Sequence, residues 1–232
     1  MDHPRSIKEE LRGVYDRIAP YFNETRKHLW PPMEQFIDEV SPCTLADLGC
    51  GTGRGLLHAA SGGCDVKGVD SSKGQIDTAS ENIEKAGYTK EITLILSDLE
   101  SLPLDSETID NSIMIASLHH LPTRESRIKA LDEAYRCTRK NGQILVSVWS
   151  WDQKRFREQH RSRIEKRREI GELDGPLPGD IMVPWRSGVK EMRFYHLYGP
   201  GELDAEIEMS GWTLSRSYFD GRNHWAECVK AP

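Results

Sequence analysis

The sequence predicts an α/β fold: a doubly wound, Rossmann-like sheet of seven mostly parallel strands with a C-terminal antiparallel hairpin. From Thr44 to Ser150 short apolar runs alternate with helical patterns, which is typical of β–α units whose parallel sheet is covered on both faces. A glycine-rich turn follows the first of these runs. Two apolar segments near the C-terminus, separated by a turn at Asp220-Gly221, predict the closing hairpin.

Two helices are predicted before the sheet. Ser6 and Glu9 match a capping box, and apolar residues then recur at helical spacing until Pro20, where we expect the helix to end. A second helical pattern runs from Met33 to Val40 and should end at the Ser41-Pro42 pair that follows.

The remaining elements are expected in alternation. The predicted strands are TLADLG, CDVKGVD, EITLILSD, IDNSIMIAS, QILVSVW, Trp212 to Ser217 and Trp225 to Lys230, and the predicted helices cover Arg54 to Ala60, Lys73 to Ala86, Glu125 to Thr138 and Glu202 to Met209. We interpret the 232 residues as one domain, with a helical cap (1–40), a sheet core (44–150), an insertion (151–200) and a closing segment (201–232). The insertion is the expected place for substrate selection, since variable loops on a rigid scaffold usually carry it.

Composition narrows the class of protein. No apolar stretch approaches the roughly 18–20 residues of a membrane helix, and the start lacks the apolar centre of a signal peptide, so we expect a soluble, cytoplasmic protein. The five cysteines include no C-x-x-C pair, which predicts reduced thiols and no metal site. The formal net charge of −6 argues against a protein that coats nucleic acid, yet Trp151 to Ile170 holds eight Lys and Arg against four Asp and Glu.

The strongest motif follows the first predicted strand and opens a helix. It reads Asp47-Leu48-Gly49-Cys50-Gly51-Thr52-Gly53, and glycines suit a sharp turn whose backbone approaches a ligand. Asp70, at the end of the second strand, is placed to accept hydrogen bonds from ribose hydroxyls, and Asp98, after the third, from an adenine amino group. The alternative is a plain tight turn with two exposed acids, but three such features in register favour a nucleoside site.

This constellation resembles the class I S-adenosylmethionine-dependent methyltransferases over roughly Thr44 to Ser150. In that family the D-x-G-x-G-x-G motif, an acidic second-strand end and a third-strand Asp hold S-adenosylmethionine. The resemblance therefore implies S-adenosylmethionine as the cofactor, bound by Asp47, Gly49, Gly51, Gly53, Asp70 and Asp98.

Segments outside the core narrow the resemblance further. VYDRIAPYFNETR, SLHHLPTRESR, QILVSVWSWDQK, IMVPW and RFYHLYGPGEL together look like the tRNA methyltransferases that esterify 5-carboxymethyluridine at the anticodon wobble position. The resemblance implies methyl transfer to the carboxylate of that nucleoside, with the anticodon stem-loop of tRNA as partner.

The chemistry of this reaction needs positioning more than a general base, because a carboxylate of pKa about 4 is already ionised at neutral pH. Arginines suit a carboxylate or phosphate clamp through forked hydrogen bonds, and the candidates are Arg26, Arg124, Arg127 and Arg193. His120, in the loop that the resemblance assigns to the active site, is expected to orient the carboxylate or the uracil; backbone hydrogen bonding is the alternative for this His pair.

Aromatic side chains are the expected contacts of a splayed base, although each also suits the protein core. The substrate-binding candidates are Tyr21, Trp30, Trp185, Tyr195, His196 and Tyr198. The basic run from Arg155 to Arg168 is expected to meet phosphates of the anticodon stem, with a solvated helix face as the alternative.

An edge strand suggests a protein partner. In the strand order usual for this fold Ile92 to Leu96 lies at the sheet edge without a charge or Pro, and such an edge invites pairing. The family resemblance implies a small zinc-ribbon activator subunit here, forming a heterodimer through Ile92, Leu94, Leu96, Leu102 and Leu104. Coverage within the chain or self-association is the alternative.

Two other functions stay open at this point. A methyltransferase acting on a small molecule shares the same core, and a non-catalytic cofactor- or RNA-binding subunit belongs to a different class. The VPW and RFYHLY segments favour RNA over a small acid, and the complete cofactor motif favours catalysis.

Overall fold

The computed structural model describes residues 4–25, 28–169 and 179–232. The helices are α1 (Pro4–Thr25), α2 (Pro31–Val40), α3 (Arg54–Ser61), α4 (Lys73–Ala86), α5 (Arg124–Cys137), α6 (Arg157–Glu169) and α7 (Glu202–Glu208), with one 3-10 turn at Leu118–His120. The strands are β1 (Thr44–Leu48), β2 (Asp65–Asp70), β3 (Ile92–Leu96), β4 (Ile109–Ile115), β5 (Thr138–Trp149), β6 (Asp180–Trp185), β7 (Glu191–His196), β8 (Thr213–Phe219) and β9 (Asn223–Val229).

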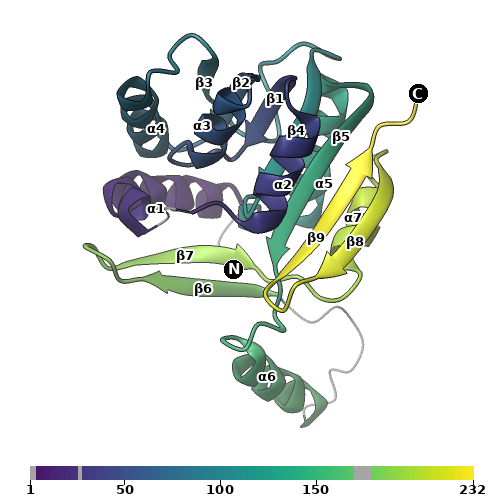
Figure 1. Ribbon diagram of the computed structural model, residues 1–232. Helices are drawn as coiled ribbons and strands as arrows, with labels where there is room; N and C mark the ends of the chain where they lie inside the picture. The colour runs from purple at the N-terminus through teal and green to yellow at the C-terminus, as the bar shows by residue number, and fades with distance from the viewer. Residues whose placement is uncertain (1–3, 26–27, 170–178) are drawn as a thin grey trace.

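The main sheet has seven strands in the order β3-β2-β1-β4-β5-β9-β8 (Figure 1). The first five are parallel, whereas β9 runs antiparallel to β5 and β8 antiparallel to β9. This confirms the predicted fold class and the closing hairpin. The insertion adds a separate antiparallel hairpin, β6–β7, which the sequence reading did not assign.

Helices cover both faces of the sheet because its central strands are apolar on both sides. Leu45 and Val66 face a cluster with α2, α3 and α4, whereas Ala46 and Val69 face a second cluster with α5 and α7. Alternate residues of one strand therefore belong to different halves of the core. Among the helices that the structure describes, none has the length and apolar character needed to span a membrane.

Helix α1 continues through Pro20 to Thr25, so the expected end at Pro20 was wrong. Pro20 is exposed, where water satisfies a carbonyl that loses its helical donor. The helix is also held on both sides of the proline: Ile18 is fully buried, and the Asn23 amide exchanges hydrogen bonds with Asn82 of α4. Tertiary contacts thus outweigh a local helix-breaking signal.

The carboxyl ends of the parallel strands meet α1 and the β6–β7 hairpin (Figure 1). Asp16 of α1 accepts hydrogen bonds from Ser72 Oγ (2.6 Å) and from the Gly74 amide (2.9 Å) at the start of α4. On the other side Arg17 forms an ion pair with Glu191 of β7. Helix α1 is therefore fixed between the sheet and the hairpin, and it covers the carboxyl ends of the strands.

Strand β3 lies at the edge of the sheet, as expected, and pairs with β2. Leu96 is exposed, Leu94 and Leu104 are half-buried, and Ile92 is buried. Leu102, expected as a partner contact, is 5% exposed and packs into the core beneath α5. Its side chain is used within the fold, so only the outer leucines remain accessible at this edge.

Candidate active site

A pocket opens at the carboxyl ends of β1, β2 and β4, beneath α1. Its wall is formed by α1, the glycine loop after β1, the ends of β2 and β3, the 3-10 turn after β4, and β7. The pocket collects eight of the sequence-predicted residues, namely Gly49, Gly51, Asp70, Asp98, Trp30, His120, Arg193 and Tyr195. Ligands commonly bind at this edge of doubly wound sheets.

The glycine loop is shaped by backbone requirements. Gly49 has φ +89°, and a Cβ at this position would lie 2.1 Å from the Ser117 hydroxyl oxygen. Gly51 also has positive φ, and its amide donates to Asp70 Oδ2 over 2.9 Å. Gly53 precedes α3 in the left-handed conformation and packs on Ala79 of α4 without lining the pocket. Residues with a Cβ adopt such φ values only at a cost in energy.

Asp70 is fixed at the end of β2. Its Oδ1 accepts from the Ser72 amide over 2.9 Å while Oδ2 accepts from Gly51. Burial raises the pKa of the Asp70 carboxyl although backbone amides favour its ionised form. Each carboxylate oxygen keeps a second lone pair, so the group remains able to accept from ligand hydroxyls at the pocket wall.

Asp98 also lies at the pocket, but it already has a partner in the protein. Lys8 of α1 forms ion pairs with both Asp98 and Glu100. This contact ties the N-terminal part of α1 to the loop after β3. A ligand that uses Asp98 as an acceptor therefore shares it with Lys8.

The pocket fits the nucleoside part of S-adenosylmethionine. Thr52 Oγ1 and Gln75 Oε1 are buried at its wall and have no hydrogen-bond partner in the described part of the chain. Buried polar atoms are normally paired, so these two are suited to a polar ligand. Together with Asp70 and Asp98 they supply hydrogen-bonding groups beside a glycine loop that leaves room for a ligand.

Asp47, the first residue of the motif, is buried and lies just behind the pocket wall. Its Oδ2 is close enough to Gly55 that a Cβ there would approach it to 2.6 Å. Burial raises the pKa of the Asp47 carboxyl from 3.8 to about 7, against the opposing charge of Arg54. The folded protein thus holds a proton that the unfolded chain releases near pH 4.

This pKa gives a pH-dependent stability with a defined sign. Between pH 4 and pH 7 the folded state binds more protons than the unfolded state, so Asp47 lowers the stability as the pH rises through this window. Asp47→Asn, which does not ionise, should therefore unfold at a higher temperature than wild type at pH 8, with a smaller difference at pH 4. Thermal unfolding at both pH values without cofactor measures this. Asp77→Asn, on the exposed face of α4, is the control; an Asp47→Asn difference that does not change with pH contradicts the assignment.

His120 is paired at both ring nitrogens. Its Nδ1–H donates to the Phe194 carbonyl of β7 over 2.9 Å, so Nε2 is left to accept from the Tyr15 hydroxyl over 2.8 Å. Burial lowers the pKa of His120 to about 3, which keeps the ring neutral. In this geometry His120 joins β7 to α1 at the pocket wall.

An aromatic wall lies next to His120. The Tyr195 ring stacks on His119 (centroids 4.8 Å apart) and on Trp149 (4.6 Å). His119 Nδ1 accepts from the Trp149 amide, whereas its Nε2 is buried without a partner. Burial lowers the pKa of His119 far below its ordinary value, so this ring is also neutral.

Arg193 places a buried positive charge in this wall. The residue is 3% exposed, and its guanidinium lies 5.1 Å from the Trp185 ring centroid and 5.2 Å from that of Tyr195. Its Nε has no hydrogen-bond partner among the described residues, whereas its guanidinium interacts with the Tyr15 hydroxyl. The ion pairs found among the described residues do not include Arg193. Buried charges are normally paired, so Arg193 is prepared for an anion that enters the pocket.

Three other predicted substrate residues form a structural network away from the pocket. Arg127 binds Glu206 through Nη2–Oε1 and Nε–Oε1 contacts of 2.7 and 2.9 Å, and the Tyr198 hydroxyl donates to Glu206 over 2.8 Å. His196 lies between Asp180 and Glu202 at 2.6 and 2.7 Å. These side chains join α5, α7 and the base of the hairpin. Their polar groups are satisfied within the protein, so the structure does not bring them to the substrate.

The remaining candidates are dispersed. Tyr21 packs on the hairpin at Gly188. Trp185 stacks on Phe22, and its ring also contacts the Arg193 guanidinium. Arg124 is exposed at the start of α5, away from the pocket, and Arg26 lies outside the described residues.

Helix α1 contributes pocket residues that the sequence reading missed. They are Lys8, Leu11, Arg12, Tyr15 and Phe22. Their spacing of three, four and seven residues places them on one side of a helix, and this periodicity was the available signal. A periodic apolar stripe does not distinguish a helix that packs on the core from one that covers a pocket, so none of these five residues was predicted for the site.

Comparisons with known proteins point to methyltransferases. Residues 46–146 match a family model described as a methyltransferase domain. The tRNA (carboxymethyluridine(34)-5-O)-methyltransferase of Schizosaccharomyces pombe is 27% identical, over 96% of this chain and 96% of its own length. The enzyme of the same name from Xenopus tropicalis is 30% identical over 93% of this chain, and a probable tRNA methyltransferase 9B of Homo sapiens is 29% identical over 84%. The chain spans 40% and 37% of these two relatives.

Solved structures share the fold. The 1,6-didemethyltoxoflavin-N1-methyltransferase of Burkholderia thailandensis, solved with S-adenosylhomocysteine, has a TM-score of 0.71 at 14% identity and covers 100% of this chain and 92% of its own. A methyltransferase of Methanosarcina mazei has a TM-score of 0.69 at 17% identity, over 88% and 98%. The family model and the relatives show an S-adenosylmethionine-dependent methyltransferase domain, and the solved structures show the shared fold.

Proposed function

We propose that this methyltransferase acts on tRNA and esterifies the carboxylate of 5-carboxymethyluridine at the anticodon wobble position. The observation that carries the proposal is Arg193, a buried cation at the pocket wall for which the described residues provide no carboxylate partner. A substrate carboxylate is an anion that matches this site in charge and in forked geometry. The names of the relatives from Schizosaccharomyces pombe and Xenopus tropicalis support the same substrate.

The residues of the pocket have different proposed roles. S-adenosylmethionine, when bound, supplies an electrophilic methyl group. Gly49, Gly51, Asp70 and Asp98 would hold this cofactor at the strand ends. Arg193 would hold the acceptor carboxylate on the side of β7, where Trp185 and Tyr195 keep the guanidinium in place.

No residue needs to remove a proton from the acceptor, since a carboxylate is ionised at neutral pH. This agrees with the neutral, doubly hydrogen-bonded His120. The hydrogen bond between His120 and Tyr15 instead holds β7 in place relative to α1. This would set the position of Arg193 relative to the cofactor. Catalysis would then rest on orientation and on electrostatic placement.

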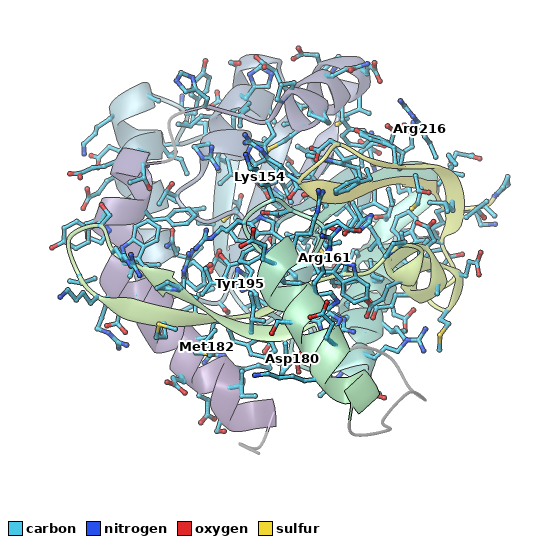
Figure 2. The ribbon with its side chains drawn as sticks, turned by 90° about the horizontal axis from the view of Figure 1, so that it is seen from below. Lys154, Arg161, Asp180, Met182, Tyr195 and Arg216 are labelled. Carbon is cyan, nitrogen blue, oxygen red and sulfur yellow. The ribbon has the colours of Figure 1, made fainter. Side chains whose placement is uncertain are left out.

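Helix α6 is proposed to contact tRNA phosphates. The helix carries the basic run and projects beyond the hairpin, where Arg157, Arg161 and Lys166 are exposed (Figures 1 and 2). It is anchored at its start by Phe156, which is buried among residues of the insertion. Exposed arginines on a projecting helix suit the backbone of a nucleic acid.

The edge strand β3 is proposed to bind a zinc-ribbon activator subunit in a cytoplasmic heterodimer. The support is the unpaired outer side of β3, with Leu96 54% exposed at its end. A partner strand would satisfy the free backbone groups and cover Leu96. Any zinc would belong to that subunit.

The experiment is methyl transfer from radiolabelled S-adenosylmethionine to tRNA that contains carboxymethyluridine, with and without the activator, followed by nucleoside analysis. We expect label in a base-labile methyl ester of the wobble uridine. Unmodified tRNA is the control, because it lacks the acceptor carboxylate. Label in free small acids but not in tRNA would overturn the proposed substrate, and equal activity with and without the activator would count against the heterodimer.

A further inference from the structure

A row of side chains leads from the pocket to the outer edge of the sheet. Ile115, which lines the pocket, pairs in register with Ser147, Ser147 pairs with Trp225, and Trp225 pairs with Tyr218 on β8. Directly opposite residues in a sheet share a face. The row therefore crosses four strands on the face that carries α2.

Aromatic contacts continue along this row. Trp30, at the pocket wall, meets the Trp225 ring edge-on with centroids 5.7 Å apart. Tyr218 is parallel to Trp225, with an interplanar angle of 9° and centroids 6.3 Å apart. The Arg216 guanidinium lies over Tyr218, 4.7 Å from its ring centroid. We call Trp30, Trp225, Tyr218 and Arg216 the aromatic column.

The column changes from buried to exposed along its length. Trp225 is 1% exposed and Tyr218 is half-buried, whereas the Arg216 side chain is 64% exposed and projects from the edge strand (Figure 2). Glu227 lies 3.6 Å from Arg216 in solvent, a pair that contributes little to stability. The outermost group of the column is thus a solvent-exposed guanidinium that lies over an aromatic ring.

Positive charge also gathers near this end of the sheet. The Gln153 side chain donates to the carbonyl of Arg222, in the turn between β8 and β9, so the start of the basic segment lies against that turn. Lys154, next to Gln153, is exposed. A ligand that stacks on the exposed end of the column would therefore meet Lys154 on the way to α6.

We propose that the aromatic column is a stacking platform for a nucleotide that flanks the methylated one in the single-stranded anticodon loop. The proposal rests on the proposed function. Stacked aromatic rings and guanidinium planes are the groups that hold unpaired bases, and the column is continuous with the pocket through Trp30 and Ile115. The base would stack on Arg216, and Tyr218 would fix the plane of that guanidinium.

The test compares Arg216→Ala, Tyr218→Ala, Arg216→Lys and Tyr218→Phe, in the complex with its activator if that is needed for activity. Two readouts are used: KM and kcat for carboxymethylated tRNA, and the Kd of a fluorescent anticodon stem-loop by anisotropy. The two alanine variants and Arg216→Lys should raise KM and Kd about tenfold with kcat unchanged, whereas Tyr218→Phe, which keeps the ring, should stay within about twofold of wild type. The double alanine variant should lose no more than either single variant, because both remove one platform.

Lys140→Ala is the matched control, because Lys140 is exposed at the opposite end of the sheet and its loss also removes one charge. If the alanine variants have the same KM and Kd as Lys140→Ala, the platform is overturned. It is also overturned if only Arg216→Ala weakens binding and Arg216→Lys restores it, because that result indicates a charge contact without stacking. Altered self-association without a change in RNA binding would assign the surface to a protein. Wild-type protein that transfers no methyl group to the tRNA overturns the proposed function, and the anisotropy readout then decides the platform on its own.

Discussion

Replacing Arg193 with Met is expected to remove methyl transfer to tRNA without lowering the stability of the protein. The charge that would hold the acceptor carboxylate is lost, and removing one preorganised electrostatic contact costs about 10²–10³-fold in kcat. The wild-type guanidinium is buried, and residues 4–25, 28–169 and 179–232 provide no carboxylate partner for it, so a Met of similar length should leave the midpoint of thermal unfolding unchanged or raise it. Steady-state methyl transfer and thermal unfolding measure the two effects.

The Arg193 variants also separate charge from geometry. Arg193→Lys keeps the charge but loses the planar fork, so its kcat should lie between those of wild type and Arg193→Met. Binding of S-adenosylhomocysteine by calorimetry is the control, since Arg193 is assigned to the acceptor side of the pocket. Wild-type kcat in Arg193→Met would place the carboxylate elsewhere, and a fall in stability equal to the fall in activity would make Arg193 a structural residue.

The largest effect on stability is expected from Arg127→Met. Arg127 and Glu206 are 3% and 0% exposed, and the substitution leaves the Glu206 carboxylate buried without its cation. Breaking one side of such a pair costs about 3–5 kcal/mol of unfolding free energy. Urea denaturation followed by fluorescence measures the change.

A double variant tests whether the cost is that of an unpaired charge. Arg127→Met combined with Glu206→Gln removes both charges and leaves an acceptor for the Tyr198 hydroxyl, so most of the lost stability should return. Lys85→Met, which breaks an exposed pair with Glu81 on α4, should cost no more than about 1 kcal/mol. If the double variant is as unstable as the sum of the two single variants, the pair acts through packing and not through charge.

The alternation of apolar runs after Thr44 is local information, and it predicted the sheet, its parallel strands and the closing hairpin. The glycine spacing after β1 was equally informative, because Gly49 and Gly51 adopt positive φ angles that glycine reaches without a steric penalty. Local patterns failed at Pro20, where the helix is held by contacts with α4 from a distant part of the sequence.

The predicted site residues show the same difference between local patterns and long-range contacts. The sequence made Arg127 and Arg193 equal candidates for binding a carboxylate. Only the folded structure distinguished the two. Glu206, 79 residues from Arg127, neutralises that guanidinium, whereas β7 places Arg193 between two aromatic rings at the pocket.

The sequence by itself determined the fold class, the cofactor loop and the carboxylates at the strand ends, because each depends on neighbouring residues or on the common direction of parallel strands. The tertiary structure alone decided which charged side chains are neutralised within the protein and which face the pocket. That outcome depends on partners far apart in the chain, and the desolvation of a buried charge is set by everything packed around it.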